Sequence, residues 1–198
     1  MEKPQLVPLF AKWLYSKKLD IDRFNIDLSD IEFRKNHFNN TSVELHFLDK
    51  PNNIPLKTVI QQSVDEYFYK IMKVQNYTKI HITESWVNRS DNGQEHHLHT
   101  HSNSILSGIL YLTEAKNTAD TKFIDMDHVP LSFDVSEFNI WNSTEFSMSP
   151  EKGLLLLFPS NTYHKTGVHQ ADEPRFTLSF NTFITGPVSN VGTKRVII

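Results

Sequence analysis

Histidines crowd one short segment of this 198-residue chain, which has ten histidines in total. Four of them lie within six positions, at His96, His97, His99 and His101, directly before the apolar run ILSGILYL. Neutral imidazole is a ligand for Fe, Zn, Cu and Ni, whereas several protonated imidazoles packed together would repel one another. The cluster therefore indicates either a metal site at the edge of a β-sheet or a polar loop rich in histidine.

Two histidines separated by one residue can bind the same ion, because side chains two apart in a strand point to the same face. Both the His97–His99 pair and the His99–His101 pair have this spacing, which leaves the choice between them open. A third donor has to come from another segment, and His164 supplies one shortly after the apolar stretch that ends at Pro159. The other histidines stand alone and are interpreted as ordinary polar residues: His37, His46, His81, His128 and His169.

A second candidate group lies in the segment RFTLSFNTF. Arg175, Thr177, Ser179 and Asn181 fall on one face of a strand here, with phenylalanine and leucine on the other face. One interpretation is an ordinary amphipathic strand whose polar face lies in water. In the other interpretation the polar face lines a pocket, where Arg175 binds a carboxylate of a small dicarboxylate and Tyr111 donates its hydroxyl to the same group.

Short apolar segments bounded by turn residues must position these side chains. They begin with KIHITESWV, which alternates around Ile80, Ile82 and Trp86, and continue with ILSGILYL, TKFIDM, LSFDV, FNIW, GLLLLFPS and RFTLSFNTF. Many short strands at this spacing are typical of an antiparallel sandwich or barrel. We predict a mainly β protein, a jelly roll of about eight strands with a helix on one side.

The flanking helix is predicted at about residues 55–74, where apolar side chains recur every three or four positions from Leu56 to Met72. Pro55 suits the first turn of such a helix. The helix most naturally packs on the outer face of the sheet. The chain is expected to be a single domain, 1–198, with N-terminal strands and the supporting helix in 1–76, the jelly-roll core in 77–185, and a tail or edge strand in 186–198.

Composition limits the function classes. A hydrophobic content of 38% and an aromatic content of 12% indicate a globular protein, and a net charge of -3 argues against a nucleic-acid partner. The absence of cysteine excludes disulfides, thiolate metal sites and cysteine nucleophiles. The apolar stretch near the N-terminus is too short for a signal peptide or membrane span, so a cytoplasmic location and no membrane partner are expected. No feature sets an oligomeric state.

Three segments together, HTHSNSILSGILYL, GLLLLFPSNTYHK and RFTLSFN, resemble the iron(II)/2-oxoglutarate-dependent dioxygenases. The resemblance is strongest to the prolyl-4-hydroxylase-like branch and to a group of 2OG-Fe(II) oxygenases found in bacteria and phages, and it spans roughly residues 80–183. It implies a double-stranded β-helix, which is a cupin-like jelly roll. It also implies Fe(II) as cofactor, 2-oxoglutarate as a small-molecule cosubstrate, and ascorbate as an optional reductant.

By this resemblance His99, His101 and His164 would bind the iron. His101 stands where the family usually has Asp or Glu, so the site departs from the usual triad of two histidines and one carboxylate. Replacing the carboxylate with imidazole raises the charge of the site by one, and the 2-oxoglutarate dianion would then just neutralise the bound Fe²⁺. In the alternative pairing of His97 with His99, the match to the family is poorer.

The resemblance also implies the cosubstrate contacts. Arg175 would bind the distal carboxylate of 2-oxoglutarate, Tyr111 would donate to the same group, and Asn181 would lie near the pocket. Gly153 would let the apolar strand that follows it begin tightly. No side chain beyond the metal ligands would be needed as a catalytic acid or base.

The activity that the resemblance implies is hydroxylation of a substrate C–H bond with release of succinate and CO₂. The sequence does not name the substrate, and a peptidyl or prolyl side chain is one candidate. Two other classes fit the same residues: a cupin-like three-histidine metalloprotein that acts without 2-oxoglutarate as a dioxygenase or isomerase, and a non-enzymatic jelly-roll binding module.

Overall fold

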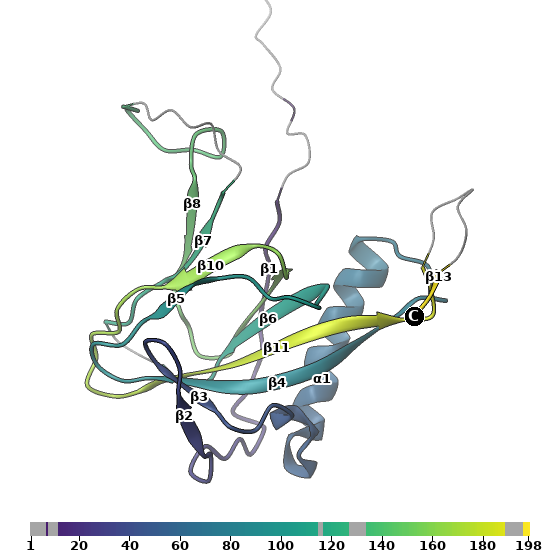
Figure 1. Ribbon diagram of the computed structural model, residues 1–198, viewed down its shortest axis with the longest axis horizontal. Helices are drawn as coiled ribbons and strands as arrows, with labels where there is room; N and C mark the ends of the chain where they lie inside the picture. The colour runs from purple at the N-terminus through teal and green to yellow at the C-terminus, as the bar shows by residue number, and fades with distance from the viewer. Residues whose placement is uncertain (1–6, 8–11, 115–116, 127–133, 189–195) are drawn as a thin grey trace, which may run out of the picture.

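The computed structural model describes residues 7, 12–114, 117–126, 134–188 and 196–198 (Figure 1). Its helical segments are η1 (Phe47–Asp49), η2 (Pro51–Asn53), α1 (Ile54–Asp65) and the π-helical η3 (Glu66–Ile71). Its strands are β1 (Tyr15–Lys18), β2 (Phe33–Lys35), β3 (Asn40–Ser42), β4 (Lys79–Ser90), β5 (His96–His99), β6 (Leu106–Tyr111), β7 (Thr121–Ile124), β8 (Glu145–Met148), β9 (Leu154–Pro159), β10 (Tyr163–Thr166), β11 (Arg175–Thr185), β12 (Pro187–Val188) and β13 (Val196–Ile197).

Two antiparallel sheets make up the body of the protein. The larger has the order β1-β9-β6-β11-β4-β3-β2 and the smaller the order β5-β10-β7-β8, while β12 and β13 pair separately. The strands from β4 to β11 are divided between the sheets, with β4, β6, β9 and β11 in the larger and β5, β7, β8 and β10 in the smaller. This arrangement is a double-stranded β-helix, so the predicted jelly roll is confirmed.

The N-terminal strands extend the larger sheet at both edges. β1 pairs with β9, and the β2–β3 hairpin is added beside β4, where Asn40 pairs with Arg89 and Thr41 with Asn88. Side chains from before residue 76 therefore reach the interior between the sheets. Of the predicted strand LSFDV, residues 131–133 lie outside the described residues, as do residues 189–195 of the predicted tail.

Helix α1 covers the outer face of the larger sheet, as predicted (Figure 1). Leu56, Ile60 and Val64 are fully buried in the main hydrophobic core. Gln61 fixes the helix to β4, because its side chain donates to the carbonyl of Ile80 and accepts from the backbone N–H of Ile82, both at 3.1 Å. Within the described residues, no helix is long and apolar enough to cross a membrane.

The predicted helical stripe is wrong at its C-terminal end. After α1 the chain continues as the π-helical turn η3, in which the hydrogen bonds skip one residue more than in an α-helix. This change in the angle per residue carries Ile71 and Met72 away from the core, and they are 56% and 47% exposed.

Strand β4 contains a β-bulge that changes which face its side chains occupy. Its pairing with β11 shifts by one residue at Thr83. Ile80 and Ile82, before the bulge, are buried in the core beneath α1, whereas Trp86, after it, lines the cavity between the sheets. The simple alternation predicted all three on one face, which is wrong because the inserted residue reverses the side-chain direction.

The predicted strand FNIW is also wrong. Phe138 and Ile140 are 76% and 80% exposed, and the segment forms a turn before β8. The side chains of Asn139 and Asn142 accept hydrogen bonds from backbone N–H groups within the turn, which competes with strand pairing.

Gly153, directly before β9, has a backbone conformation that favours glycine. Its φ is 82°, its N–H donates to the carbonyl of Tyr111, and its carbonyl accepts from the N–H of Leu19, both at 2.8 Å. A Cβ at this position would overlap the carbonyl of Leu19. The close approach of the chain before β9 therefore depends on the positive φ and the missing side chain of Gly153.

Candidate metal centre

Three histidines converge from two parts of the smaller sheet. His99 ends β5 and is directly opposite His164 on the neighbouring strand β10. His101 follows two residues after β5, and its backbone N–H donates to the carbonyl of Ser160 at 2.9 Å. One ring nitrogen from each of the three histidines lies within 4.8 Å of the other two. The structure thus brings together the set His99, His101 and His164.

Backbone carbonyls orient two of these rings. The Nδ1 atoms of His99 and His164 lie 2.8 Å and 3.0 Å from the carbonyls of His97 and Thr162. A carbonyl can only accept, so Nδ1 carries the proton in each ring and the lone pair is on Nε2. The Nε2 atoms of His101 and His164 are 3.4 Å apart. Hydrogen bonds of this kind commonly orient histidine ligands toward a metal.

Burial keeps these imidazoles neutral. It lowers the pKa of His164 to about 3, with further lowering by the neighbouring His99 and His101. Burial likewise lowers the pKa of His101 to about 4, and His99 adds to that effect. Burial also lowers the pKa of His99. At neutral pH all three rings are therefore in the form that binds metal ions.

A second bulge decides how the other two clustered histidines lie. The pairing of β5 with β10 shifts between His164 and Thr166, and this irregularity turns His96 toward the same side as His99. The two rings stack with centroids 4.6 Å apart, and both line the cavity. His97 instead lies edge-on to His37, with ring centroids 4.7 Å apart. His164 therefore lies with His99 and His101, and the alternative pair of His97 and His99 does not form the site.

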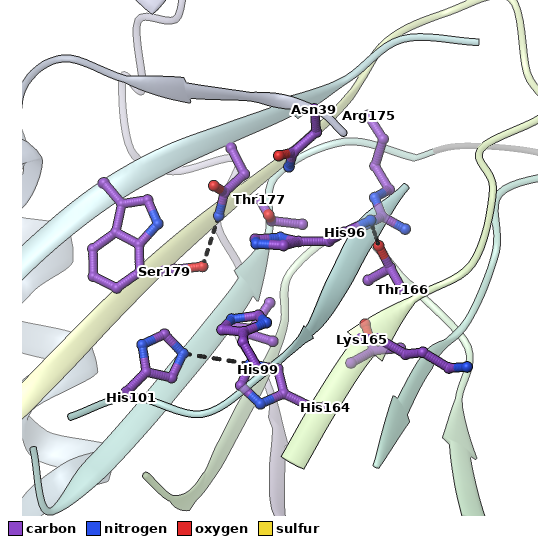
Figure 2. Close-up of a pocket in the computed structure, with 14 residues that line it drawn as sticks. Asn39, His96, His99, His101, His164, Lys165, Thr166, Arg175, Thr177 and Ser179 are labelled. Carbon is purple, nitrogen blue, oxygen red and sulfur yellow. Dashed lines mark hydrogen bonds between the residues drawn. The ribbon is translucent and has the colours of Figure 1, made fainter. Parts of the chain in front are cut away.

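Arg175 lies in the same cavity, at the end away from the three histidines (Figure 2). It is 5% exposed, and its Nη1 donates to the carbonyl of Ala119 at 3.0 Å and to the hydroxyl of Thr118 at 3.3 Å. Its Nε is buried with no partner among the described residues, and no described carboxylate forms an ion pair with it. Burial lowers the pKa of Arg175, but a guanidinium stays charged in proteins. The arginine is thus a buried cation with a free donor.

The polar face of β11 is buried and does not lie in water. Thr177 and Ser179 line the cavity beside Arg175, and both are 7% exposed. Asn181 continues this face into an adjoining second cavity, where it donates to Glu84 at 2.6 Å. Of the two interpretations of this strand, the pocket-lining one matches the structure.

Tyr111 lies behind the cavity wall. Its hydroxyl is 2.6 Å from the hydroxyl of Thr121, which does line the cavity, and burial raises the pKa of Tyr111. In this position Tyr111 orients Thr121, and a direct contact of Tyr111 with a ligand stays a prediction.

Two asparagines that the sequence did not single out complete the cavity. Asn39 comes from the turn between β2 and β3, and Asn88 from β4. The structure leaves the Nδ2 of Asn39 and the Oδ1 of Asn88 buried and unpaired among the described residues. Asn88 is two residues from Trp86 in β4, so the two-residue period of the strand could have placed both side chains on the cavity face. No such local pattern marks Asn39. Buried polar atoms without partners are rare and point to a bound ligand or water.

The donors fit a divalent metal with a small anionic partner. Two nitrogens that each lie about 2.1 Å from one ion are about 3.0–3.4 Å apart at octahedral to tetrahedral angles. The separation between His101 and His164 is 3.4 Å. At the other end of the cavity, Arg175 and Asn39 offer unpaired donors to a carboxylate. The arrangement therefore fits a metal chelate that extends toward Arg175.

Comparison with known proteins agrees with this chemistry. Residues 84–181 match the family model described as "Putative 2OG-Fe(II) oxygenase". This range contains all three histidines and Arg175. No curated protein matches the sequence.

Solved structures show the same fold. A prolyl-4-hydroxylase from Pseudomonas putida is 12% identical, with 86% of this chain and 92% of that chain covered and a TM-score of 0.54. HygX from Streptomyces hygroscopicus, solved with nickel and 2-oxoglutarate bound, is 11% identical, with 86% and 82% covered and a TM-score of 0.59. SnoN, an α-ketoglutarate-dependent epimerase of nogalamycin biosynthesis, is 15% identical, with 84% and 73% covered and a TM-score of 0.59.

At these identities the solved structures establish the fold, and the family match over residues 84–181 adds the class. The double-stranded β-helix and the three-histidine site agree with that class. The matched region, residues 84–181, therefore belongs to the 2OG-Fe(II) oxygenase family.

Proposed function

We propose that His99, His101 and His164 bind Fe(II), that Arg175 binds the distal carboxylate of 2-oxoglutarate, and that the protein hydroxylates a C–H bond of an organic substrate. The single observation that carries this proposal is the buried guanidinium of Arg175, whose Nε has no partner among the described residues, in the same cavity as three neutral imidazoles. A buried cation without a counter-ion is costly, and a dicarboxylate whose other end chelates the metal would remove that cost.

The protein would supply position and a dry environment, and the bound iron would supply the activation of dioxygen. The balanced reaction is R–H + 2-oxoglutarate + O₂ → R–OH + succinate + CO₂. One oxygen atom enters the new succinate carboxylate and the other enters the product. His96 now lies among the side chains between the three histidines and Arg175, so it would rotate aside as 2-oxoglutarate enters.

The fate of the substrate is a finer part of the proposal. Hydroxylation of a peptidyl or prolyl side chain is one form, and the Pseudomonas putida neighbour is named a prolyl-4-hydroxylase. SnoN is named an epimerase, so the same fold also serves other outcomes at a C–H bond. We favour hydroxylation because it needs no catalytic acid or base: the only protein groups it requires at the reaction centre are the metal ligands.

The test is succinate formation from 2-oxoglutarate by the Fe(II)-loaded protein, together with calorimetric titration of 2-oxoglutarate into the Mn(II)-loaded protein. Arg175→Gln should weaken 2-oxoglutarate binding about 100-fold, because it removes one partner of a buried charge pair. Its affinity for Mn(II) should not change. Arg23→Gln, an exposed arginine stacked on Phe24, is the matched control. Normal 2-oxoglutarate binding by Arg175→Gln would refute the cosubstrate assignment.

The three-histidine site also favours a second candidate. Three neutral imidazoles without a carboxylate suit a metalloprotein that works without 2-oxoglutarate, as a dioxygenase or an isomerase. In that case the protein would bind Mn(II) or Fe(II) tightly, would not bind 2-oxoglutarate, and would form no succinate. The succinate assay and the titration of 2-oxoglutarate described above therefore separate the candidates.

A further inference from the structure

A second cavity adjoins the histidine cavity and offers room for a substrate. Its volume is about 320 Å³, and it shares Trp86 and His101 with the first cavity. Volumes of roughly 300–1,000 Å³ are typical of small-molecule sites. The remaining lining residues come from the β2–β3 hairpin, β4, β11 and the segments beside them: Arg34, Thr41, Leu45, Glu84, Thr100, Ser102 and Asn181. A molecule in this cavity would therefore contact Trp86 and His101, which both cavities share.

The second cavity contains one cation and one anion. Arg34 lies on β2 and Glu84 on β4, and neither forms an ion pair with any described residue. The Oε1 atom of Glu84 accepts a hydrogen bond from Asn181, which orients the carboxylate. Each charge therefore has capacity for a ligand group of the opposite sign.

The sheet register separates these two charges. Arg34 pairs with Thr41, and Thr41 pairs with Asn88, so Arg34 is level with a position four residues along β4 from Glu84. Two strand spacings and four residues correspond to about 10 Å across and about 14 Å along the sheet. Long side chains close part of this distance, and a ligand that contacts both charged groups has to span the rest.

We propose that the second cavity binds a small zwitterion whose ammonium and carboxylate are separated by a chain of carbons, as in an ω-amino acid or a free basic amino acid. The ammonium would bind Glu84 and the carboxylate would bind Arg34. Trp86 and Leu45 would contact the methylene groups between the charges, and the indole face of Trp86 also suits a cation. This inference rests on the proposed function, because it assigns the substrate of the same site.

The experiment is calorimetric titration of a homologous series into the protein loaded with Mn(II) and 2-oxoglutarate. The series is glycine, β-alanine, γ-aminobutyrate, 5-aminovalerate, 6-aminohexanoate and lysine. Affinity should rise from glycine toward the longer members. The alkylamine and the carboxylate that match the best ligand should each bind at least about fivefold more weakly, because each lacks one charge contact. Equal affinity across the series, or tighter binding of an uncharged capped peptide, would overturn the proposal.

Two variants assign the charges. Arg34→Gln should weaken the best zwitterion about fivefold and remove the preference over the matching alkylamine. Glu84→Gln should weaken it about tenfold and remove the preference over the matching carboxylate. Lys35→Gln and Glu32→Gln remove the same charges at exposed neighbouring positions that do not line this cavity, so both should bind like the wild type. Equal weakening of every ligand by Arg34→Gln and Glu84→Gln would contradict the assignment.

The outcome also separates this inference from the proposed function. Binding of Mn(II) and 2-oxoglutarate is measured before any zwitterion is added. If both bind and no zwitterion does, the substrate class is wrong and the oxygenase chemistry stands. If 2-oxoglutarate does not bind, the proposed function itself fails.

Discussion

His99 on β5 and His164 on β10 are cross-strand partners, and their ring centroids are 4.2 Å apart. Because the two strands hydrogen-bond to each other, the smaller sheet itself fixes the separation of two of the three nitrogen donors. His101 depends instead on a loop held by the backbone bond to Ser160. The third donor is therefore the one that mutation can change with least damage to the fold.

Variants of His101 should separate metal binding from folding. His101→Ala should weaken Mn(II) binding about 100-fold or more, since even outer-shell changes at metal sites cost about 10–100-fold. His101→Asp should keep tight binding, because it restores the carboxylate of the usual triad. The measurement is calorimetric titration of Mn(II). His46→Ala, an exposed histidine outside the site, is the control. Wild-type affinity in His101→Ala would remove His101 from the ligand set.

The metal-free protein should lose stability in acid through its buried histidines. The pKa of His164 is about 3 in the folded protein, below its ordinary value of 6.5. The unfolded chain therefore takes up the proton first as pH falls below 6.5, and this favours unfolding. Between pH 7 and pH 5 the free energy of unfolding should fall by about 2 kcal/mol from His164 alone. Urea denaturation at both pH values measures this change, and His164→Gln should show a smaller one.

Asn39 should matter for binding and little for stability. Its Nδ2 is buried and has no partner within the described part of the chain, while its Oδ1 accepts from Asn36 at 3.1 Å. Asn39→Ala should change the free energy of unfolding by less than about 1 kcal/mol, because removing an unpaired donor offsets the lost hydrogen bond. It should weaken 2-oxoglutarate binding about tenfold, because a donor to a charged group is lost. Asn40→Ala, which does not line the cavity, is the matched control for the titration.

Gly108 tests the packing of the larger sheet. A Cβ on Gly108 would overlap the ring of Phe180, which is fully buried. Gly108→Ala should therefore lower the free energy of unfolding by about 1–3 kcal/mol through overpacking. Adding Phe180→Leu should recover part of the loss, because the shorter side chain makes room for the new methyl group. An unchanged denaturation midpoint for Gly108→Ala would show that the ring moves without cost.

Much of the site could be predicted from local patterns. The polar positions led by Arg175 and the presence of a His-x-His pair follow from the two-residue period of a strand, whereas the choice of His99, His101 and His164 as one set came from the family resemblance. The structure places His101 in the loop just after β5. These residues then meet in one cavity because the strands that carry them belong to one jelly roll. Their roles as ligands and cosubstrate contacts remain predictions.

What could not be predicted depends on bulges and long-range pairing. The bulge at Thr83 turns Trp86 and Asn88 toward the cavity, and the irregularity in β5 does the same for His96. Neither bulge has a glycine or a proline in the strand, so the two-residue pattern of the sequence does not indicate where the side-chain direction reverses. Asn39 enters the cavity only because its hairpin pairs with β4, and that contact joins segments about fifty residues apart.

The β2–β3 hairpin has a consequence for how this protein could diversify. It places Asn39 in one cavity and Arg34 in the other, yet it precedes the matched region that begins at residue 84 and contributes no member of the histidine triad. It pairs with β4 at two register positions, and Ser42 Oγ accepts a hydrogen bond from the backbone N–H of Val87 at 3.0 Å. Exchanging this hairpin would therefore change the contacts that Asn39 and Arg34 offer to ligands while the three histidines stay in place.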